Sequence, residues 1–237
     1  MSNESAPTSA TATSAATVSG HYQGERGSDY VAQRQSNPTW MGYALNFAYF
    51  KPYLKPADHV LDFGCGNGGM LPHLKAHVAM VEAVEVNPAA AKVARDLGFT
   101  VHPSIAAVGN TPRFDAIVSN HVLEHVRDVS ATITELRRHL KPDGKLIVKL
   151  PIDDVRSRHQ RGWSKSDVDY HLQTWTPRNF ANVLFEAGYD VEESRVITSA
   201  WNPKLFPFQK IGLGPLVFWA FSILKNRRQL FAVGRNP

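Results

Sequence analysis

Short apolar runs alternate with amphipathic stretches along the middle of the chain. The runs are rich in Val, Ile, Leu and Phe and are bounded by turn residues, which is typical of buried strands. The predicted strands are residues 59–63, 81–86, 100–102, 114–119, 145–150, 191–198 and 229–234. The predicted helices between them are residues 68–77, 89–97, 130–140 and 177–187. This alternation predicts an α/β fold, a doubly wound, mostly parallel seven-stranded sheet with helices on both faces.

Right-handed crossovers bring the carboxyl ends of parallel strands to one edge of such a sheet, where ligands bind. We therefore expect the chemistry to follow four strand ends, at Phe63, Val86, Ser119 and Leu150. Residues 141–144 (KPDG) are predicted to form a turn before the fifth strand.

A glycine-rich turn follows the first predicted strand. Gly64, Gly66 and Gly68 permit sharp turns and let a ligand approach the backbone, and the helix that follows presents free N–H groups. Glu85 ends the second strand, where a carboxylate can accept hydrogen bonds from both hydroxyls of a ribose. These features predict a site for a cofactor that contains a nucleoside.

The same turn also satisfies the dinucleotide pattern of nicotinamide enzymes, through Gly64, Gly66 and Gly69. Asp62 argues against a pyrophosphate ligand, because its negative charge directly precedes the turn and would repel a phosphate. That charge suits a cationic group, such as the α-ammonium of a methionine moiety. An NAD(P)-dependent oxidoreductase is the alternative enzyme, and a non-catalytic scaffold of the same fold is the alternative outside catalysis.

Three segments resemble motifs of the class I S-adenosylmethionine-dependent methyltransferases. Residues 60–68 (VLDFGCGNG) resemble the first motif of that family, and Glu85 matches its ribose-binding acid. Residues 114–126 (FDAIVSNHVLEHV) and 140–148 (LKPDGKLIV) resemble segments of the subgroup that includes the ubiquinone-biosynthesis O-methyltransferases. The resemblance covers about residues 45–198. It implies a Rossmann-like methyltransferase fold, S-adenosyl-L-methionine as the cofactor and a small-molecule acceptor.

The resemblance also implies which residues hold the cofactor. The glycine turn would line the methionine end of the cofactor, and the end of the second strand would hold the ribose. The residues after the third strand would flank the adenine, and those after the fourth strand would lie beside the sulfonium. The predicted cofactor-binding residues are Asp62, Gly64, Cys65, Gly66, Gly68, Glu85, Val86, Asn87, Ser104, Ile105 and Asn120. Ser104 departs from the family, which often carries an acid at or beside that position.

Residues 121–125 (HVLEH) allow three interpretations. Their spacing matches the inverted zinc-peptidase pattern His-x-x-Glu-His, but that site requires a helix, and this segment directly follows a strand. Ubiquinone-type relatives include some that bind a divalent ion through Glu-x-x-Glu-His, and here His121 replaces the first Glu. In the third interpretation, Glu124 and His125 anchor the loop. We favour the third interpretation and assign no metal to the chain.

Methyl transfer to a hydroxyl requires a base, for which histidine is suited. The candidate catalytic residues are His121, which follows the fourth strand, and His171, in a region that often shapes the acceptor pocket of the family. Anchoring of its own loop is an equal alternative for His171. Aromatic residues that could wall an aromatic or lipid-like acceptor, or simply fill the core, are Trp163, Trp175, Trp201 and Phe206.

The 237 residues are enough for one large domain. Residues 1–20 are almost wholly Ser, Thr, Ala and small polar residues, which predicts a disordered tail. Residues 21–54 are predicted to form an N-terminal helical lid. Residues 55–237 then form the catalytic domain, with an apolar insertion at about residues 199–226.

Residues 205–224 carry a single charge, Lys210, and are interrupted by Pro and Gly. Their uninterrupted part, residues 211–224, is too short to span a bilayer comfortably. The segment predicts either a buried helix or hairpin, or a peripheral membrane contact. The net charge of +5 is not gathered into a basic stripe, so no nucleic-acid partner is expected. Cys65 is the only cysteine, which fits the cytoplasm. Nothing in the sequence indicates the oligomeric state.

Overall fold

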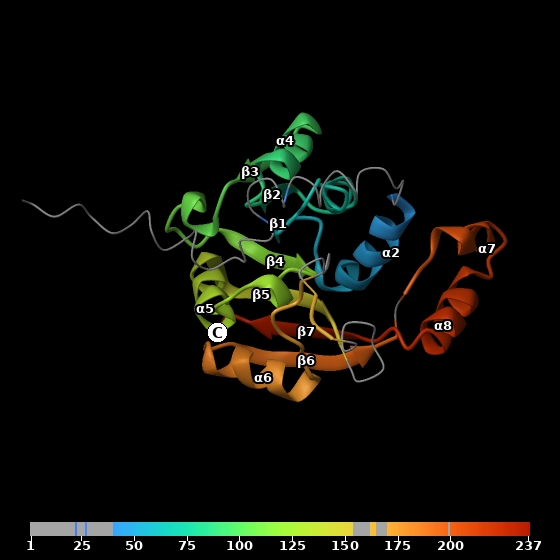
Figure 1. Ribbon diagram of the computed structural model, residues 1–237. Helices are drawn as coiled ribbons and strands as arrows, with labels where there is room; N and C mark the ends of the chain where they lie inside the picture. Colours follow the sequence, from blue (N-terminus) through green and yellow to red (C-terminus); the bar gives the residue numbers. More distant parts are fainter. Residues whose placement is uncertain (1–21, 23–26, 28–39, 154–161, 165–169, 199) are drawn as a thin grey trace, which may run out of the picture.

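The computed structural model describes residues 22, 27, 40–153, 162–164, 170–198 and 200–237. Its centre is a seven-stranded sheet in the order β3-β2-β1-β4-β5-β7-β6 (Figure 1). The strands are β1 (His59–Phe63), β2 (Met80–Val84), β3 (Thr100–His102), β4 (Phe114–Asn120), β5 (Leu140–Pro151), β6 (Asp190–Ile197) and β7 (Gln229–Arg235). Neighbouring strands are parallel except where β7 pairs with β5 and β6. The predicted mostly parallel sheet is confirmed.

Seven α-helices are described, together with several 3-10 turns. The helices are α2 (Trp40–Phe50), α3 (Leu71–Lys75), α4 (Pro88–Asp96), α5 (Val129–His139), α6 (Pro177–Glu186), α7 (Pro207–Lys210) and α8 (Gly214–Leu224). The 3-10 turns used below are η3 (Ile105–Val108), η4 (Leu123–His125) and η6 (Pro203–Leu205). Helix α3 begins later than predicted, because Gly68 has a φ of 79° and cannot belong to a helix.

The predicted turn at residues 141–144 is instead part of β5. Asp143 has a φ of 61°, and the pairing register of β5 with β4 shifts between Phe114 and Ala116. The backbone stays paired because Asn236 bonds to both sides of this kink: Asp143 N donates to Asn236 O, and Asn236 N donates to Gly144 O, both at 2.8 Å. This pairing partner is 92 residues away or more in sequence, so local turn chemistry could not indicate it.

Two apolar cores cover the two faces of the sheet. One core contains side chains of α5 and α6, among them Ile133 and Phe180. The other contains side chains of α2, α3 and α4, among them Phe50, Leu71 and Ala94. Figure 1 shows α5 and α6 on the opposite side of the sheet from α2 and α4. The carboxyl ends of the parallel strands meet at one edge between these layers.

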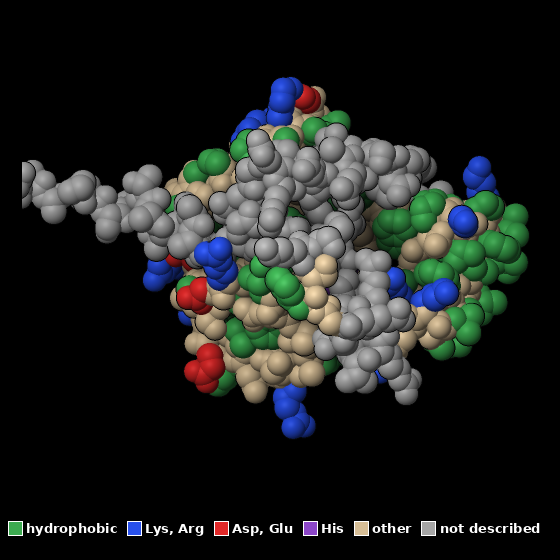
Figure 2. Space-filling view, viewed as in Figure 1, with side chains coloured by type: hydrophobic (Ala, Val, Ile, Leu, Met, Phe, Trp, Pro, Cys, Tyr) green, Lys and Arg blue, Asp and Glu red, His purple; other side chains and the backbone are tan. Residues whose placement is uncertain are grey.

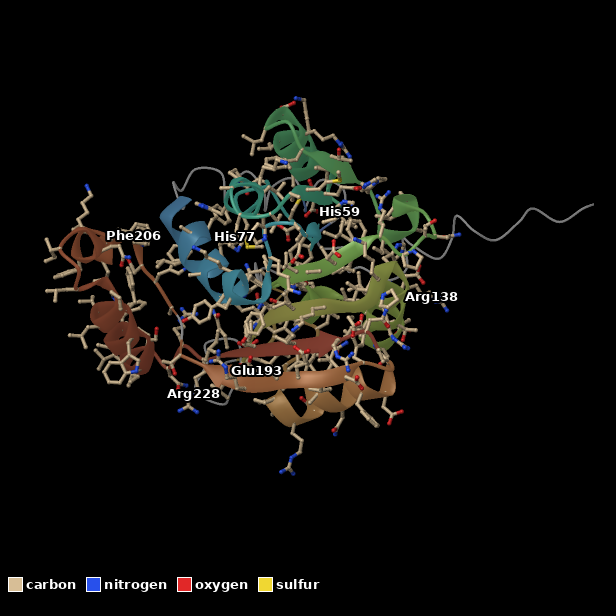
Figure 3. The ribbon with its side chains drawn as sticks, turned by 180° about the vertical axis from the view of Figure 1, so that it is seen from behind. His59, His77, Arg138, Glu193, Phe206 and Arg228 are labelled. Atoms are coloured by element: carbon tan, nitrogen blue, oxygen red, sulfur yellow. The ribbon has the colours of Figure 1, made fainter. Side chains whose placement is uncertain are left out.

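The connection from β6 to β7 forms a separate lobe, which contains η6, α7 and α8. We call residues 200–228 the α7–α8 lobe. It projects beyond α2 at one end of the molecule (Figure 1), with Phe206 inside it and Arg228 where the chain returns to β7 (Figure 3). It occupies the stretch predicted as an apolar insertion. The domain boundaries stay predictions, and the predicted tail lies outside the described residues.

Among the described residues, no helix is both long and apolar enough to cross a membrane.

Phe231 tests the packing of α2 on the sheet. It is fully buried on β7, and its ring lies 6.4, 6.2 and 5.4 Å from the rings of Tyr49, Phe50 and Tyr53. We expect Phe231→Ala to lower the free energy of unfolding by about 3–5 kcal/mol, measured by urea denaturation, because it leaves a cavity. The control is Phe185→Ala on α6, whose side chain is 69% exposed, with a change under about 0.5 kcal/mol. Equal losses in both variants would contradict this packing role.

Candidate functional site

The glycine turn after β1 is held against the end of β2. Gly64 N and Cys65 N both donate to Val84 O, at 2.8 and 3.1 Å. Gly64 has a φ of 82°, and a Cβ there would collide with Val122. Gly66 has a φ of 56°, and among the described residues a Cβ there would meet no atom within 4 Å. The described part of the chain therefore leaves the backbone of Gly66 accessible to a ligand.

Glu85 joins the glycine turn to the turn after β2. One of its carboxylate oxygens accepts from Gly66 N at 2.8 Å and the other from Asn87 N at 2.7 Å. Burial raises the pKa of Glu85, and these backbone donors oppose the rise. Each oxygen keeps a second lone pair, so the carboxylate can also accept ligand hydroxyls.

Asp62 lies at the other side of the same turn and is 2% exposed. Its Oδ2 has no hydrogen-bond partner among the described residues. Burial, together with the charge of Glu85, raises the pKa of Asp62 to about 7. A buried carboxyl without a partner is unfavourable by itself. It fits a ligand that brings a cation, such as the α-ammonium group of S-adenosylmethionine.

Several predicted cofactor residues use their side chains to build the turns. Asn87 Oδ1 caps α4 by accepting from Ala89 N and Ala90 N, and its Nδ2 donates to Tyr22 O at 3.1 Å. Ser104 Oγ caps η3, and Ile105 packs against the core. These side chains shape the walls of the site.

The remaining predicted residues of these turns contribute mainly shape. Cys65 is buried, and burial raises the pKa of its thiol, so it does not act as a thiolate. A Cβ at Gly68 would approach Ala94 Cβ to 2.9 Å, so this glycine brings the turn close to α4. Val86 is half-buried between the second strand and the Asn87 cap.

Asn120 and His121 follow the end of β4. The Oδ1 of Asn120 is buried and has no hydrogen-bond partner among the described residues. His121 adopts a φ of 58°, with its N–H donating to Lys149 O at 2.8 Å. Burial, followed by the charges of Lys149, His171 and His125, holds the pKa of His121 well below its usual range. His121 is therefore neutral at physiological pH and able to accept a proton.

His171 belongs to a second group at the same edge. Its Nδ1 lies 2.6 Å from Asp153 Oδ2, and its ring centroid lies 5.1 Å from that of His125. Potential ligand atoms of Glu124, His125 and His171 all lie within 4.8 Å of one another. Glu124 Oε1 also lies 3.7 Å from His121 Nδ1 and from His125 Nε2. The structure thus brings both candidate catalytic histidines to one cluster.

The sequence analysis did not identify Asp153 or Lys149. Asp153 follows the fifth strand, at the edge where the topology predicts chemistry. Lys149 is a charge inside an apolar strand, and that interruption was the available signal. Its Nζ is buried, donates to Asn46 Oδ1 at 2.6 Å and lies 5.2 Å from the centre of the Tyr49 ring. Burial lowers the pKa of Lys149 to about 7.

The described residues of the predicted lid segment contact the site. Tyr43 of α2 donates to Asn67 Oδ1 of the glycine turn at 3.0 Å. The backbone carbonyl of Tyr22 accepts a hydrogen bond from Asn87 Nδ2, and the Tyr22 hydroxyl lies 3.3 Å from His125 Nε2. The lid role itself stays a prediction.

The η4 turn does not match a zinc peptidase, because residues 123–125 form a 3-10 turn and not the required helix. Of the aromatic residues considered as an acceptor wall, Trp163 is 81% exposed and Trp175 belongs to the core. Trp201 and Phe206 lie together in the α7–α8 lobe, with ring centroids 5.7 Å apart. The structure therefore does not bring these four aromatic side chains together into one wall of an acceptor pocket.

Comparisons with known proteins agree with this geometry. A family model described as a methyltransferase domain matches residues 33–194. The chain belongs to this methyltransferase domain family. The fold and the predicted membership of the class I S-adenosylmethionine-dependent methyltransferases are thereby confirmed.

Curated relatives include the ubiquinone biosynthesis O-methyltransferase of Bartonella tribocorum, 33% identical over 163 residues, which are 61% of this chain and 63% of that protein. The ubiquinone biosynthesis O-methyltransferase of Xanthomonas oryzae pv. oryzae is 38% identical over 99 residues, 38% of this chain and 41% of that protein. Phosphoethanolamine N-methyltransferase 1 of Arabidopsis thaliana is 28% identical over 154 residues, 57% of this chain and 31% of that protein. The chain thus spans less than two thirds of the length of each of these relatives.

Solved structures share the fold at low identity. An S-adenosylmethionine-dependent methyltransferase from Mesorhizobium loti gives a TM-score of 0.60 at 16% identity, covering 79% of this chain and 95% of that one. Haemonchus contortus phosphoethanolamine N-methyltransferase 2, in complex with phosphomonomethylethanolamine and S-adenosylhomocysteine, gives 0.60 at 16% identity, covering 81% and 52%.

Asp62 gives the protein a testable pH dependence. Between about pH 4 and pH 7 the unfolded chain releases a proton that folded Asp62 retains, so the free energy of unfolding falls as pH rises. We expect Asp62→Asn to raise the free energy of unfolding at pH 8 by about 2–4 kcal/mol without ligand and to have little effect at pH 4. Urea denaturation at pH 4, 6 and 8 measures this.

The matched control is Asp115→Asn. Partial burial raises the pKa of Asp115, but bonds from His59 N and Lys141 Nζ, at 2.8 and 2.9 Å, outweigh it and lower that pKa. Loss of this carboxylate therefore destabilises the protein increasingly as pH rises. If Asp62→Asn followed the same trend, the proposed electrostatics of the glycine turn would be wrong.

Proposed function

We propose that this methyltransferase transfers the methyl group of S-adenosyl-L-methionine to a small-molecule acceptor of aromatic or lipid-like character. The observation that carries the proposal is the pair of carboxyls, buried Asp62 and half-buried Glu85, on the two sides of the glycine turn at Gly66. A buried, unpartnered acid suits the ammonium group of an amino acid, and the second acid suits ribose hydroxyls. A pyrophosphate would meet two negative charges there.

Each end of the cofactor has a group in this chain to receive it. Asp62 would accept from the α-ammonium, and Glu85 would accept from the ribose hydroxyls while it keeps its bonds to Gly66 and Asn87. The open face of Gly66 and the amide of Asn120 would lie along the cofactor. S-adenosylmethionine supplies an electrophilic methyl group when bound.

The residues at the ends of β4 and β5 would prepare the acceptor. Asp153, 2.6 Å from His171 Nδ1, favours the tautomer whose Nε2 can accept a proton. His121 is neutral because of burial and adjacent positive groups, and it can serve the same role or orient the acceptor. A base at this place favours a hydroxyl acceptor, since a hydroxyl must lose its proton during methylation.

Calorimetry with S-adenosylhomocysteine and with NAD tests the cofactor. Binding of S-adenosylhomocysteine supports the proposal, binding of NAD alone favours an oxidoreductase, and binding of neither favours a scaffold. A turnover screen against phenols, sugars, lipid intermediates and peptides then identifies the acceptor class. A cytoplasmic location belongs to the same proposal, and no nucleic-acid partner does.

Glu85→Ala is expected to weaken S-adenosylhomocysteine binding on the order of 10²-fold, measured by calorimetry. The substitution removes the ribose acceptor and leaves two backbone N–H groups without their partner. The control is Glu82→Gln on β2, three residues before Glu85, whose carboxylate bonds His59 and His102. It should leave that affinity unchanged. Equal affinities for wild type and Glu85→Ala would remove the ribose assignment.

Asp153→Asn and His171→Ala are expected to lower kcat by about 10²–10⁴-fold on a hydroxyl acceptor and to leave S-adenosylhomocysteine affinity unchanged. The reason is loss of the base or of the carboxylate that orients it. The acid limb of the kcat pH profile should also shift in Asp153→Asn. An unaltered kcat and pH profile in both variants would show that the pair only anchors its loop.

A further inference from the structure

The α7–α8 lobe presents large apolar side chains to solvent. Ile211, Leu216, Trp219, Ile223 and Leu224 are each 52–83% exposed. In the space-filling view, apolar side chains gather over α7 and α8, with Lys and Arg around them (Figure 2). Contiguous apolar surface of this kind marks a place of interaction.

The apolar outer face of α8 is exposed to solvent because the opposite face of the helix packs inside the lobe. Phe218 and Ser222 are buried, and Ser222 Oγ accepts from Ala200 N at 2.6 Å and donates to Phe218 O at 2.7 Å. Leu216 and Trp219 lie on the other side of the helix, where their spacing keeps them together. The helix therefore has a fixed inner side and an apolar outer side, without the polar outer face that a water-exposed helix normally carries.

The lobe also carries the whole excess charge of the chain. Residues 200–228 contain five Lys and Arg and no Asp or Glu. The other 21 basic residues of the chain equal its 21 acidic residues, which leaves the net charge of +5 on the lobe. All five basic side chains are exposed, and they are Lys204, Lys210, Lys225, Arg227 and Arg228.

The lobe leaves the sheet at the edge that holds the site. Strand β6 runs parallel to β5, since both pair antiparallel with β7, and Ile197 and Pro151 both lie opposite Gln229. Both ends of the lobe therefore start at the carboxyl edge. Within the lobe, Trp201 lies against Gly42 of α2, and this helix contacts the glycine turn. The lobe that carries the apolar surface therefore packs against α2, which belongs to the predicted lid.

We propose that the α7–α8 lobe docks this protein on the surface of an anionic lipid bilayer, with the carboxyl edge of the sheet turned towards the lipid. Apolar and aromatic residues with Lys and Arg around them are the composition of interfacial membrane segments, and the basic side chains complement anionic headgroups. Protein interfaces, in contrast, are depleted of Lys, and three lysines surround this surface. The docking does not depend on methyl transfer.

The test is sedimentation of the full-length protein with sucrose-loaded vesicles, without cofactor. Vesicles of phosphatidylglycerol and phosphatidylcholine in equal parts should sediment the protein, and vesicles of phosphatidylcholine alone should do so at least about tenfold less well. Raising the salt concentration should weaken binding to the anionic vesicles, because the electrostatic part is screened. Absence of sedimentation with either vesicle would overturn the proposal.

Two variants separate the apolar and the charged parts. Leu216→Ser/Trp219→Ser/Ile223→Ser removes the outer face of α8, and Lys210→Gln/Lys225→Gln removes two charges; each should lower vesicle affinity on the order of tenfold. The matched controls are Leu97→Ser/Phe185→Ser and Lys55→Gln/Lys75→Gln, which change exposed residues outside the lobe and should retain wild-type binding.

Thermal melting and S-adenosylhomocysteine calorimetry on each variant serve as folding controls, and both should match wild type. Equal losses of vesicle binding in lobe and control variants would overturn the docking site. Light scattering provides the other decisive outcome: a concentration-dependent dimer that the triple variant abolishes, without vesicle binding, would assign the surface to a second copy of the chain.

Discussion

The carboxylate of Glu85 is the constraint on which the site depends. It bonds the backbone of Gly66 and of Asn87, and so it holds the turns after β1 and β2 at a set distance from each other. That arrangement places a second acid, Asp62, in a buried position without a partner. The empty protein therefore carries an electrostatic cost, which a cationic ligand relieves on binding. The buried carboxyl of Asp62 thus lowers the stability of the fold without ligand, and the same carboxyl is already in place for a cationic ligand.

The carboxyl edge has two parts. The first, at the ends of β1 and β2, carries the acids Asp62 and Glu85. The second, after β4 and β5, combines the acids Glu124 and Asp153 with His121 and His171, and burial lowers the pKa of His121 and of the neighbouring Lys149. A cationic group is attracted to the first part, whereas the lowered pKa keeps His121 neutral in the second. This division follows from which strands are adjacent, since β1 pairs with both β2 and β4.

Two further parts of the molecule are packed near the same edge. Helix α2 is held on β7 through Phe231 and reaches the glycine turn through Tyr43. The α7–α8 lobe leaves from the ends of β6 and β7 and contacts α2 at Gly42. The glycine turn, α2 and the α7–α8 lobe are therefore neighbours at this edge of the sheet.

The sequence by itself determined the alternation of strands and helices, the glycine turn and its two acids, because these features depend on short-range periodicity and spacing. It also indicated His121 and His171 through their places after strand ends. Only the tertiary structure decided the rest. Asp153 became the partner of His171, Asn236 joined the predicted turn at residues 141–144 to the predicted fifth strand, and burial lowered the pKa of Lys149. It also decided that the segment predicted to be either buried or interfacial exposes its apolar face. These outcomes depend on contacts and desolvation between residues distant in sequence, which local patterns do not encode.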